Sequence, residues 1–136
     1  MLSGSRVLVV EDEPTTALFI ADVVARAEGE VVGPFSTLRE ARSFILAGHT
    51  ADAAILDVNL ADGEVTPLLE ALRARGTPVI MYTGNTALPR RISDRHPDLT
   101  VLHKPVQPGR LVGELRRHMN GMGDSGGHRP SRPEAP

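Results

Sequence analysis

The sequence predicts an α/β fold in which helices cover both faces of a parallel, five-stranded sheet. Short apolar runs alternate along the chain with longer segments whose apolar residues recur at helical spacing. The apolar runs are continuous and lack the polar–apolar alternation of a sheet with one solvated face. Both observations are typical of parallel sheets built from strand–helix–strand units.

The expected strands are short and rich in Val, Ile and Leu. We expect Gly33-Pro34 to stop the second strand. The expected strands are residues 6–10 (RVLVV), 30–34 (EVVGP), 53–57 (AAILD), 77–83 (TPVIMYT) and 99–103 (LTVLH).

The expected helices follow the strands in turn, and local residues mark several of their ends. Pro14 is tolerated near the start of the first helix. Ser36 or Thr37 supplies the N-cap of the second helix, and Gly48 ends it. The fourth helix is interrupted by Pro89 and has few apolar residues, so we expect it to be short or mobile. The five helices are expected within residues 15–28, 36–48, 63–76, 85–97 and 108–119.

The composition is that of an ordinary globular domain. The chain has 136 residues, of which 40% are hydrophobic and 24% are charged, and this is enough for one buried core. A net charge of −2 gives no sign of a nucleic-acid or membrane partner. No apolar run reaches the roughly 18 residues of a membrane span, and the absence of cysteine excludes disulfides. The N-terminus does not resemble a signal peptide, so we expect a cytoplasmic protein.

The end of the sequence differs from the rest. Residues 121–136 (GMGDSGGHRPSRPEAP) have no apolar periodicity and are rich in Gly and Pro. Such a segment cannot build a packed core. We therefore expect one domain over residues 1–120 and a disordered C-terminal tail over residues 121–136.

Polar residues with chemical function stand at the ends of four expected strands. Ligands of open parallel sheets bind outside the carboxyl ends of the strands. We therefore expect acids, a hydroxyl group and an ammonium group to converge on one crevice. In chain order these residues are Glu11, Asp12, Asp57, Thr83 and Lys104.

Three neighbouring carboxylates, those of Glu11, Asp12 and Asp57, would repel one another and raise one another's pKa values. A Mg²⁺ ion relieves this repulsion, because it prefers carboxylate and carbonyl oxygens, waters and phosphoryl oxygens. Lys104 is the only lysine among 15 basic residues and adds a compact positive charge, while Thr83 adds a hydroxyl donor. Asp57 can thus end a buried strand because the metal and the ammonium group compensate its charge.

This combination predicts phosphoryl capture. A carboxylate such as Asp57 can act as a nucleophile and form an acyl phosphate, while Mg²⁺ and Lys104 neutralise the phosphoryl oxygens. Taken alone, each position has an ordinary alternative: the acids before Pro14 could favour a helix N-terminus, Asp57 could cap a loop, and Thr83 could begin a turn. The prediction depends on four such positions falling at strand ends in the right order.

The motifs VLVVEDEP, AAILDVNLADG, PVIMYTG and HKP resemble those of the receiver domains of bacterial two-component response regulators. The resemblance covers about residues 5–120. It implies a flavodoxin-like (CheY-like) fold with strand order 2-1-3-4-5. The phrases VVGPFSTLREA and LDVNL, together with the short tail, look most like stand-alone, single-domain receivers of alphaproteobacteria.

The resemblance also implies roles for the individual residues. Asp57 would be phosphorylated by a histidine kinase or a histidine phosphotransfer protein, and Thr83 and Lys104 would contact the phosphoryl oxygens. Asp12 and Asp57 would bind Mg²⁺ directly, the backbone carbonyl of Asn59 would be the third protein ligand, and Glu11 would act through water. The implied protein signals to a further protein through the fourth helix, fifth strand and fifth helix, or it acts as a phosphate shuttle or sink. It would be a monomer or weak homodimer and would bind neither nucleic acid nor membrane.

Two positions depart from the family pattern. Receivers usually carry Phe or Tyr three residues before the lysine, where this chain has Val101, and some relatives carry Tyr after the Thr-Gly pair, where it has Asn85. Tyr82 is the only tyrosine, and strand alternation places it on the opposite side of its strand from Thr83. The usual aromatic switch is therefore missing at both places.

Three other functions are less well supported by the sequence. A Mg²⁺-dependent phosphatase with Asp57 as nucleophile would need a second acid two residues later, where Asn59 stands. A flavin-binding protein would need a hydroxyl-rich loop after the first strand, where the acids of EDEP would repel a phosphate. A phosphorylation-independent scaffold would not need the complete set of acids, threonine and lysine.

Overall fold

The computed structural model describes residues 2–84 and 88–120. The predicted tail (121–136) lies outside the described residues, as do residues 85–87 of the predicted fourth helix, among them Asn85. No helix in the described part of the chain is long and apolar enough to cross a membrane.

A parallel sheet lies at the centre of the domain. Its strands are β1 (Arg6–Val10), β2 (Glu30–Phe35), β3 (Ala53–Leu56), β6 (Val79–Thr83) and β7 (Thr100–His103). They pair in the order β2-β1-β3-β6-β7, which is the predicted order 2-1-3-4-5 when the five strands of this sheet are counted alone. The predicted flavodoxin-like fold is confirmed.

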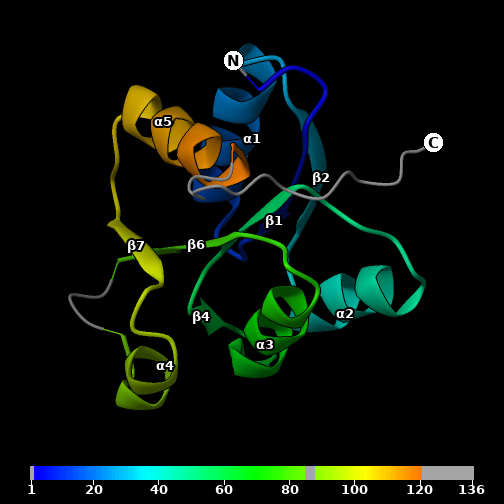
Figure 1. Cartoon of the computed structure of the whole chain (residues 1–136), viewed down its shortest axis with the longest axis vertical. Helices are drawn as coiled ribbons and strands as arrows, with labels where there is room; N and C mark the ends of the chain where they lie inside the picture. The colour runs from blue at the N-terminus through cyan, green and yellow to red at the C-terminus, as the bar shows by residue number, and fades with distance from the viewer. Residues whose placement is uncertain (1, 85–87, 121–136) are drawn as a thin grey trace.

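Helices cover both faces of the sheet, with α1 and α5 on one face and α2 and α3 on the other (Figure 1). Val7 and Val9 of β1 belong to the apolar cluster on the α1–α5 side, whereas Leu8 and Val10 belong to the cluster on the α2–α3 side. Both faces of the strand are therefore buried, which explains its continuous apolar sequence. The helices are α1 (Pro14–Arg26), α2 (Leu38–Leu46), α3 (Thr66–Ala74), α4 (Arg90–Arg95) and α5 (Pro108–Met119).

The helix starts agree with the predicted signals. Pro14 is the first residue of α1, where its missing N–H group costs nothing. Thr37 is the N-cap of α2, and its hydroxyl group accepts a hydrogen bond from the backbone N–H group of Glu40 at 3.1 Å. The helix α4 has six residues and is short, as predicted.

The second strand does not stop at Gly33-Pro34, so this prediction is wrong. β2 continues to Phe35, and the register of its pairing with β1 shifts between Leu8 and Val10. Gly33 adopts φ +103°, which other residues rarely adopt, and Pro34 lies in a strand at the edge of the sheet, where a missing N–H group is tolerated. The bend therefore lies within the strand and does not end it.

A short antiparallel ribbon occupies residues that the sequence assigned to a loop and a helix start. Its strands are β4 (Asn59–Leu60) and β5 (Gly63–Glu64). The third helix was expected from residue 63, but α3 begins at Thr66 because Gly63 and Glu64 pair with β4 instead. We call residues 59–64 the β4–β5 ribbon.

Candidate functional site

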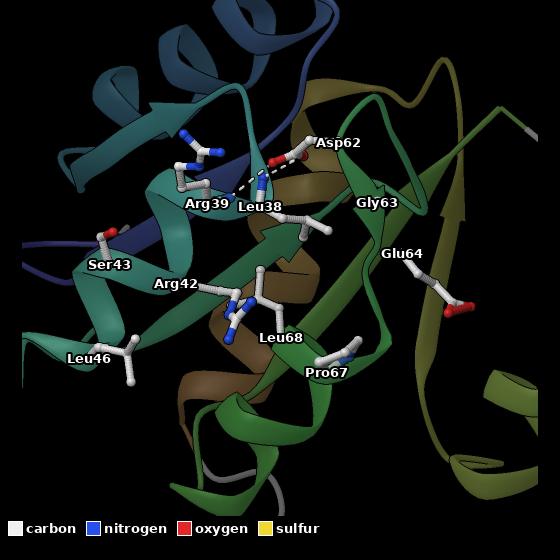
Figure 2. Close-up of a pocket in the computed structure, with 10 residues that line it drawn as sticks. All are labelled: Leu38, Arg39, Arg42, Ser43, Leu46, Asp62, Gly63, Glu64, Pro67 and Leu68. Carbon is white, nitrogen blue, oxygen red and sulfur yellow. Dashed lines mark hydrogen bonds between the residues drawn. The ribbon is translucent and has the colours of Figure 1, made fainter.

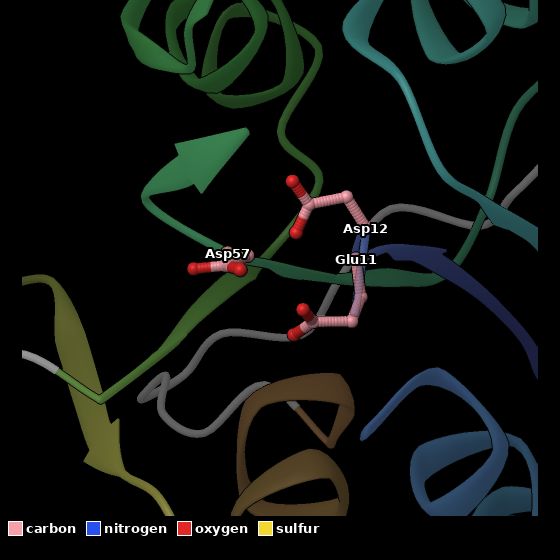
Figure 3. A group of neighbouring side chains, drawn as sticks. All are labelled: Glu11, Asp12 and Asp57. Atoms are coloured by element: carbon pink, nitrogen blue, oxygen red, sulfur yellow. The ribbon is translucent and has the colours of Figure 1, made fainter. Parts of the chain in front are cut away.

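Neighbouring strands bring the three predicted acids together. Glu11 and Asp12 follow β1, and Asp57 follows β3. Val10 and Leu56, the last residues of these two strands, are register partners, so the carboxyl ends of the strands coincide. Carboxylate oxygens of Glu11, Asp12 and Asp57 lie within 4.8 Å of one another, and Figure 3 shows the side chains turned toward a common space.

Backbone N–H groups hold each of the carboxylates. The N–H group of Glu13 donates to Glu11 (3.0 Å), that of Asn59 donates to Asp57 (3.2 Å), and that of Ala61 donates to Asp12 (3.1 Å). Glu11 is only 2% exposed and Asp57 only 5% exposed. The two buried acids are thus fixed in orientation, and two of the three donors belong to the β4–β5 ribbon.

Lys104 reaches the acids from the end of β7. Its Nζ atom lies 3.0 Å from Oε1 of Glu11 and 3.5 Å from Oδ2 of Asp57. Its backbone N–H group donates to the carbonyl group of Thr83, which ends β6 and is fully buried. The residues predicted to converge are therefore brought to the same edge of the sheet, on four different strand ends.

Burial and negative charge perturb the ionisable groups of the site. Burial, followed by the neighbouring carboxyl group of Asp57, raises the pKa of Glu11 to about 7. Burial alone would lower the pKa of Lys104, but Glu11 and Asp57 outweigh it and leave this pKa raised. One ammonium group faces three carboxylates, so the site as it stands favours an additional cation.

This donor set suits a hard divalent cation such as Mg²⁺. Mg²⁺ is typically bound by one or two carboxylates and keeps several waters. Asp12 is partly exposed beside the two buried acids, and Asn59 follows Asp57 by two residues at the start of β4. The residues present therefore fit the ion, and the roles of Asp12, Asp57, the Asn59 carbonyl and Glu11 toward it stay predictions.

Tyr82 is held on the α1–α5 side of the sheet. Its hydroxyl group accepts a hydrogen bond from the N–H group of Val106 at 3.2 Å, and Nζ of Lys104 lies 5.6 Å from the centre of its ring. Val101 packs against the opposite cluster, the one on the α2–α3 side. Tyr82 is thus packed into the core beneath the lysine, and Val101 lies on the other face of the sheet.

The sequence analysis missed one polar residue beside the site. Asp62 follows Asn59 and Ala61, whose N–H groups donate to the acids of the site. Its two oxygens accept hydrogen bonds from the N–H groups of Leu38 (2.8 Å) and Arg39 (3.1 Å) at the start of α2. The pair Asp62-Gly63 is a turn signal that could have indicated the ribbon.

Comparison with known proteins gives the family. Residues 7–116 match the sequence model of the response regulator receiver domain family. The chain is 38% identical over 122 residues to the transcriptional regulatory protein TcrA of Mycobacterium tuberculosis, and this match covers 85% of the chain and 46% of TcrA. The chain therefore spans about half the length of the curated relatives it matches.

Solved structures agree with this result. A CheY-like receiver domain protein from Methanospirillum hungatei JF-1 has a TM-score of 0.77 and 25% identity, with 88% of this chain and 97% of that chain covered. The solution structure of SdrG from Sphingomonas melonis Fr1 has a TM-score of 0.70 and 33% identity, with 88% and 98% covered. The chain belongs to the family of response regulator receiver domains, as its strand-end motifs predicted.

Proposed function

We propose that this receiver domain accepts a phosphoryl group on Asp57 from a histidine kinase or a histidine phosphotransfer protein, with Mg²⁺ bound beside it. Receiver domains are signalling modules of two-component systems. The observation that carries the proposal is the position of Asp57, which is buried between two further acids and the ammonium group of Lys104. Such a carboxylate is both a metal ligand and a nucleophile.

In the proposed reaction, a carboxylate oxygen of Asp57 attacks the phosphorus atom of the donor. A new O–P bond forms while the bond between phosphorus and the donor nitrogen breaks, and the donor keeps the electron pair of that bond. The product is an acyl phosphate. Lys104, already 3.5 Å from Asp57, moves toward the new phosphoryl oxygens, and the hydroxyl group of Thr83 donates to them.

Asp12, Asp57 and the Asn59 carbonyl group would bind Mg²⁺ directly, and Glu11 would act through water. The ion would neutralise charge on the phosphoryl oxygens, which is the main requirement of this transfer. The grouping of the three carboxylates supports this assignment, because their oxygens lie within 4.8 Å of one another and only one ammonium group, that of Lys104, faces them.

Intact-mass spectrometry tests the proposal directly. The protein is incubated with Mg²⁺ and acetyl phosphate, beside Asp57→Asn and the control Asp94→Asn, which changes an exposed aspartate of α4. We expect a hydroxylamine-labile gain of ~80 Da, one phosphoryl group, in the wild type and in Asp94→Asn but not in Asp57→Asn. A phosphorylated Asp57→Asn protein would show that another residue is the acceptor.

If the wild type shows no adduct, titration with Mg²⁺ and beryllofluoride follows. Binding of this phosphoryl mimic would support the acceptor site. The missing adduct would then mean that Asp57 accepts a phosphoryl group only from a protein donor, or that the acyl phosphate hydrolyses rapidly. Failure of both experiments would favour the phosphorylation-independent scaffold.

A further inference from the structure

A groove lies at the surface between α2 and α3 (Figure 2). It encloses about 500 Å³, a volume comparable to that of small ligand pockets. We call it the α2–α3 groove. Its lining includes Leu38, Arg42, Leu46, Gly63, Pro67 and Leu68.

The groove combines an exposed apolar side chain with positive charge. Leu46 is 79% exposed and places an apolar side chain at the rim of the groove. Arg39 and Arg42 are exposed on the same helix and form no ion pair among residues 2–84 and 88–120. Figure 2 shows Arg42 extending from α2 toward α3 beside Leu68.

Two acids, Asp62 and Glu64, also line the groove. Both oxygens of Asp62 are used by backbone N–H groups at the start of α2. Glu64 points away from the groove and pairs with Arg91. The charged side chains that line the α2–α3 groove therefore leave a positive balance beside apolar surface once Glu64 is paired with Arg91, although Asp62 keeps its negative charge and attracts Arg39.

The β4–β5 ribbon connects this groove to the acidic site through consecutive hydrogen bonds. At one end of the connection, the N–H groups of Asn59 and Ala61 hold Asp57 and Asp12. At the other end, Asp62 holds the first turn of α2. Gly63 packs closely on the same turn, since a Cβ atom there would lie 3.3 Å from Leu38. A displacement of the ribbon at Asp57 is thus carried to the wall of the groove.

We propose that the α2–α3 groove docks an acidic segment of a partner protein, and that the β4–β5 ribbon makes its affinity depend on the state of Asp57. The partner's carboxylates would pair with Arg39 and Arg42, and an apolar side chain would cover Leu46. The docking surface stands on the groove alone, whereas its dependence on Asp57 rests on the proposed function. This coupling through the β4–β5 ribbon does not involve Val101, which stands where the family usually has an aromatic residue.

The docking surface is tested by NMR titration with a short synthetic peptide of glutamate and leucine. We expect shift changes at Arg39, Arg42, Leu46 and Gly63. The charge reversal Arg39→Glu/Arg42→Glu should weaken binding about tenfold, as expected for the loss of two exposed ion pairs. The control Arg110→Glu/Arg116→Glu makes the same change of charge on exposed residues of α5 and should leave the affinity unchanged.

Four results would overturn the docking surface. A glutamine–leucine peptide of the same length could bind equally well, the charge reversal on α2 could have no effect, or the shift changes could fall elsewhere. Tighter binding of a single-stranded oligonucleotide to the same arginines would also overturn it, because the occupant would then be a nucleic acid.

The coupling is tested by measuring the affinity of the peptide with and without Mg²⁺ and beryllofluoride. We expect a change of about fivefold or more in the wild type, a usual size for coupled sites. In Asp62→Asn, which keeps the shape of the side chain, the change should shrink while the mimic still binds, as followed at the Asn59 amide group. If the mimic binds the wild type without changing peptide affinity, the coupling is wrong and the proposed function stands. If the mimic does not bind, the proposed function fails, and the docking surface is judged by the peptide titration.

Discussion

Lys104 and Glu11 form an ion pair in which the Nζ–Oε1 distance is 3.0 Å, shorter than the 3.5 Å that separates Lys104 from Asp57. The only lysine of the chain therefore lies nearer to Glu11 than to Asp57, the proposed phosphoacceptor. A cation that took over the neutralisation of Glu11 would release Lys104 toward Asp57. We therefore expect metal binding to shift the position of the lysine.

Lys104→Met should destabilise the metal-free protein by about 2 kcal/mol, between the values usual for exposed and for buried ion pairs. The substitution keeps an unbranched side chain that is one heavy atom shorter, but it leaves Glu11 and Asp57 without their counter-charge. Mg²⁺ should restore more stability to Lys104→Met than to the wild type. Urea unfolding with EDTA and with Mg²⁺ measures both effects, and Arg110→Met serves as the surface control. An equal gain in stability from Mg²⁺ in both proteins would contradict the view that the ion and Lys104 balance the same carboxylates.

Gly33→Ala should be more costly than Gly48→Ala, by about 1–3 kcal/mol. Both glycines have positive φ, +103° and +90°, so both substitutions strain the backbone. A Cβ atom at Gly33 would lie 2.6 Å from the backbone nitrogen of Phe35 and 3.0 Å from the carbonyl oxygen of Val9, whereas one at Gly48 meets nothing within 4 Å. Both variants share the strain of a positive φ. The difference between their free energies of unfolding, measured by chemical denaturation, therefore gives the cost of the steric contacts at Gly33. Equal losses would mean that β2 can relax at this bend.

Glu70→Gln should loosen α4. Glu70 of α3 pairs with Arg95 at 3.1 Å and lies 3.8 Å from His96, at the end of α4. We expect amide hydrogen exchange in α4 to become two- to fivefold faster, corresponding to about 0.5–1 kcal/mol. Added salt should bring the wild type toward the variant, because it screens the same pairs. Asp22→Asn, which breaks an ion pair within α1, should leave exchange in α4 unchanged.

His118 should make the protein less stable in acid. Burial, followed by the charge of Arg117, lowers the pKa of His118 below its ordinary value of 6.5, although Glu114 opposes this. The unfolded chain therefore takes up a proton more readily, so the stability contributed by neutral His118 is complete above pH 6.5 and is lost as the pH falls. The loss is at most about 1.4 kcal/mol per pH unit.

This effect must be measured as the difference between the wild type and His118→Gln, by urea unfolding from about pH 8 to about pH 5. The raised pKa of Glu11 acts in the opposite sense, because protonation of Glu11 stabilises the folded state as the pH falls through about 7. That contribution cancels in the difference. Parallel stability curves for the two proteins would contradict the role of His118.

The sequence predicted those features of the fold that arise from burial on both faces of the sheet. Apolar runs such as residues 53–56 have no polar face to present, so their place in a parallel sheet followed from composition and length. Once strand order was implied, parallel topology placed Glu11 and Asp57 at adjacent strand ends, and their proximity is confirmed. Functional side chains at strand ends can be predicted from a sequence because the topology of the sheet, and not the local backbone conformation, brings them together.

Local backbone geometry was less accessible. The β4–β5 ribbon has two residues in each strand, too few to show a period, so Gly63 was assigned to the start of a helix. The N–H group of Ala61, which holds Asp12, has no sequence signature because any residue except proline carries one. The α2–α3 groove was missed because it depends on how two helices diverge around the ribbon, a spacing that neither helix encodes alone.

The packing of Tyr82 has an optical consequence. The chain has one tyrosine and no tryptophan, so its near-ultraviolet emission comes chiefly from a single phenol ring. That ring is buried, its hydroxyl group is tied to Val106, and the Lys104 ammonium group lies 5.6 Å from its centre. Any event that draws the lysine toward a phosphoryl group would change the electric field at this ring. Tyr82 is therefore an intrinsic fluorophore close to the acidic site, and we expect its emission to report occupancy of that site in real time without a label.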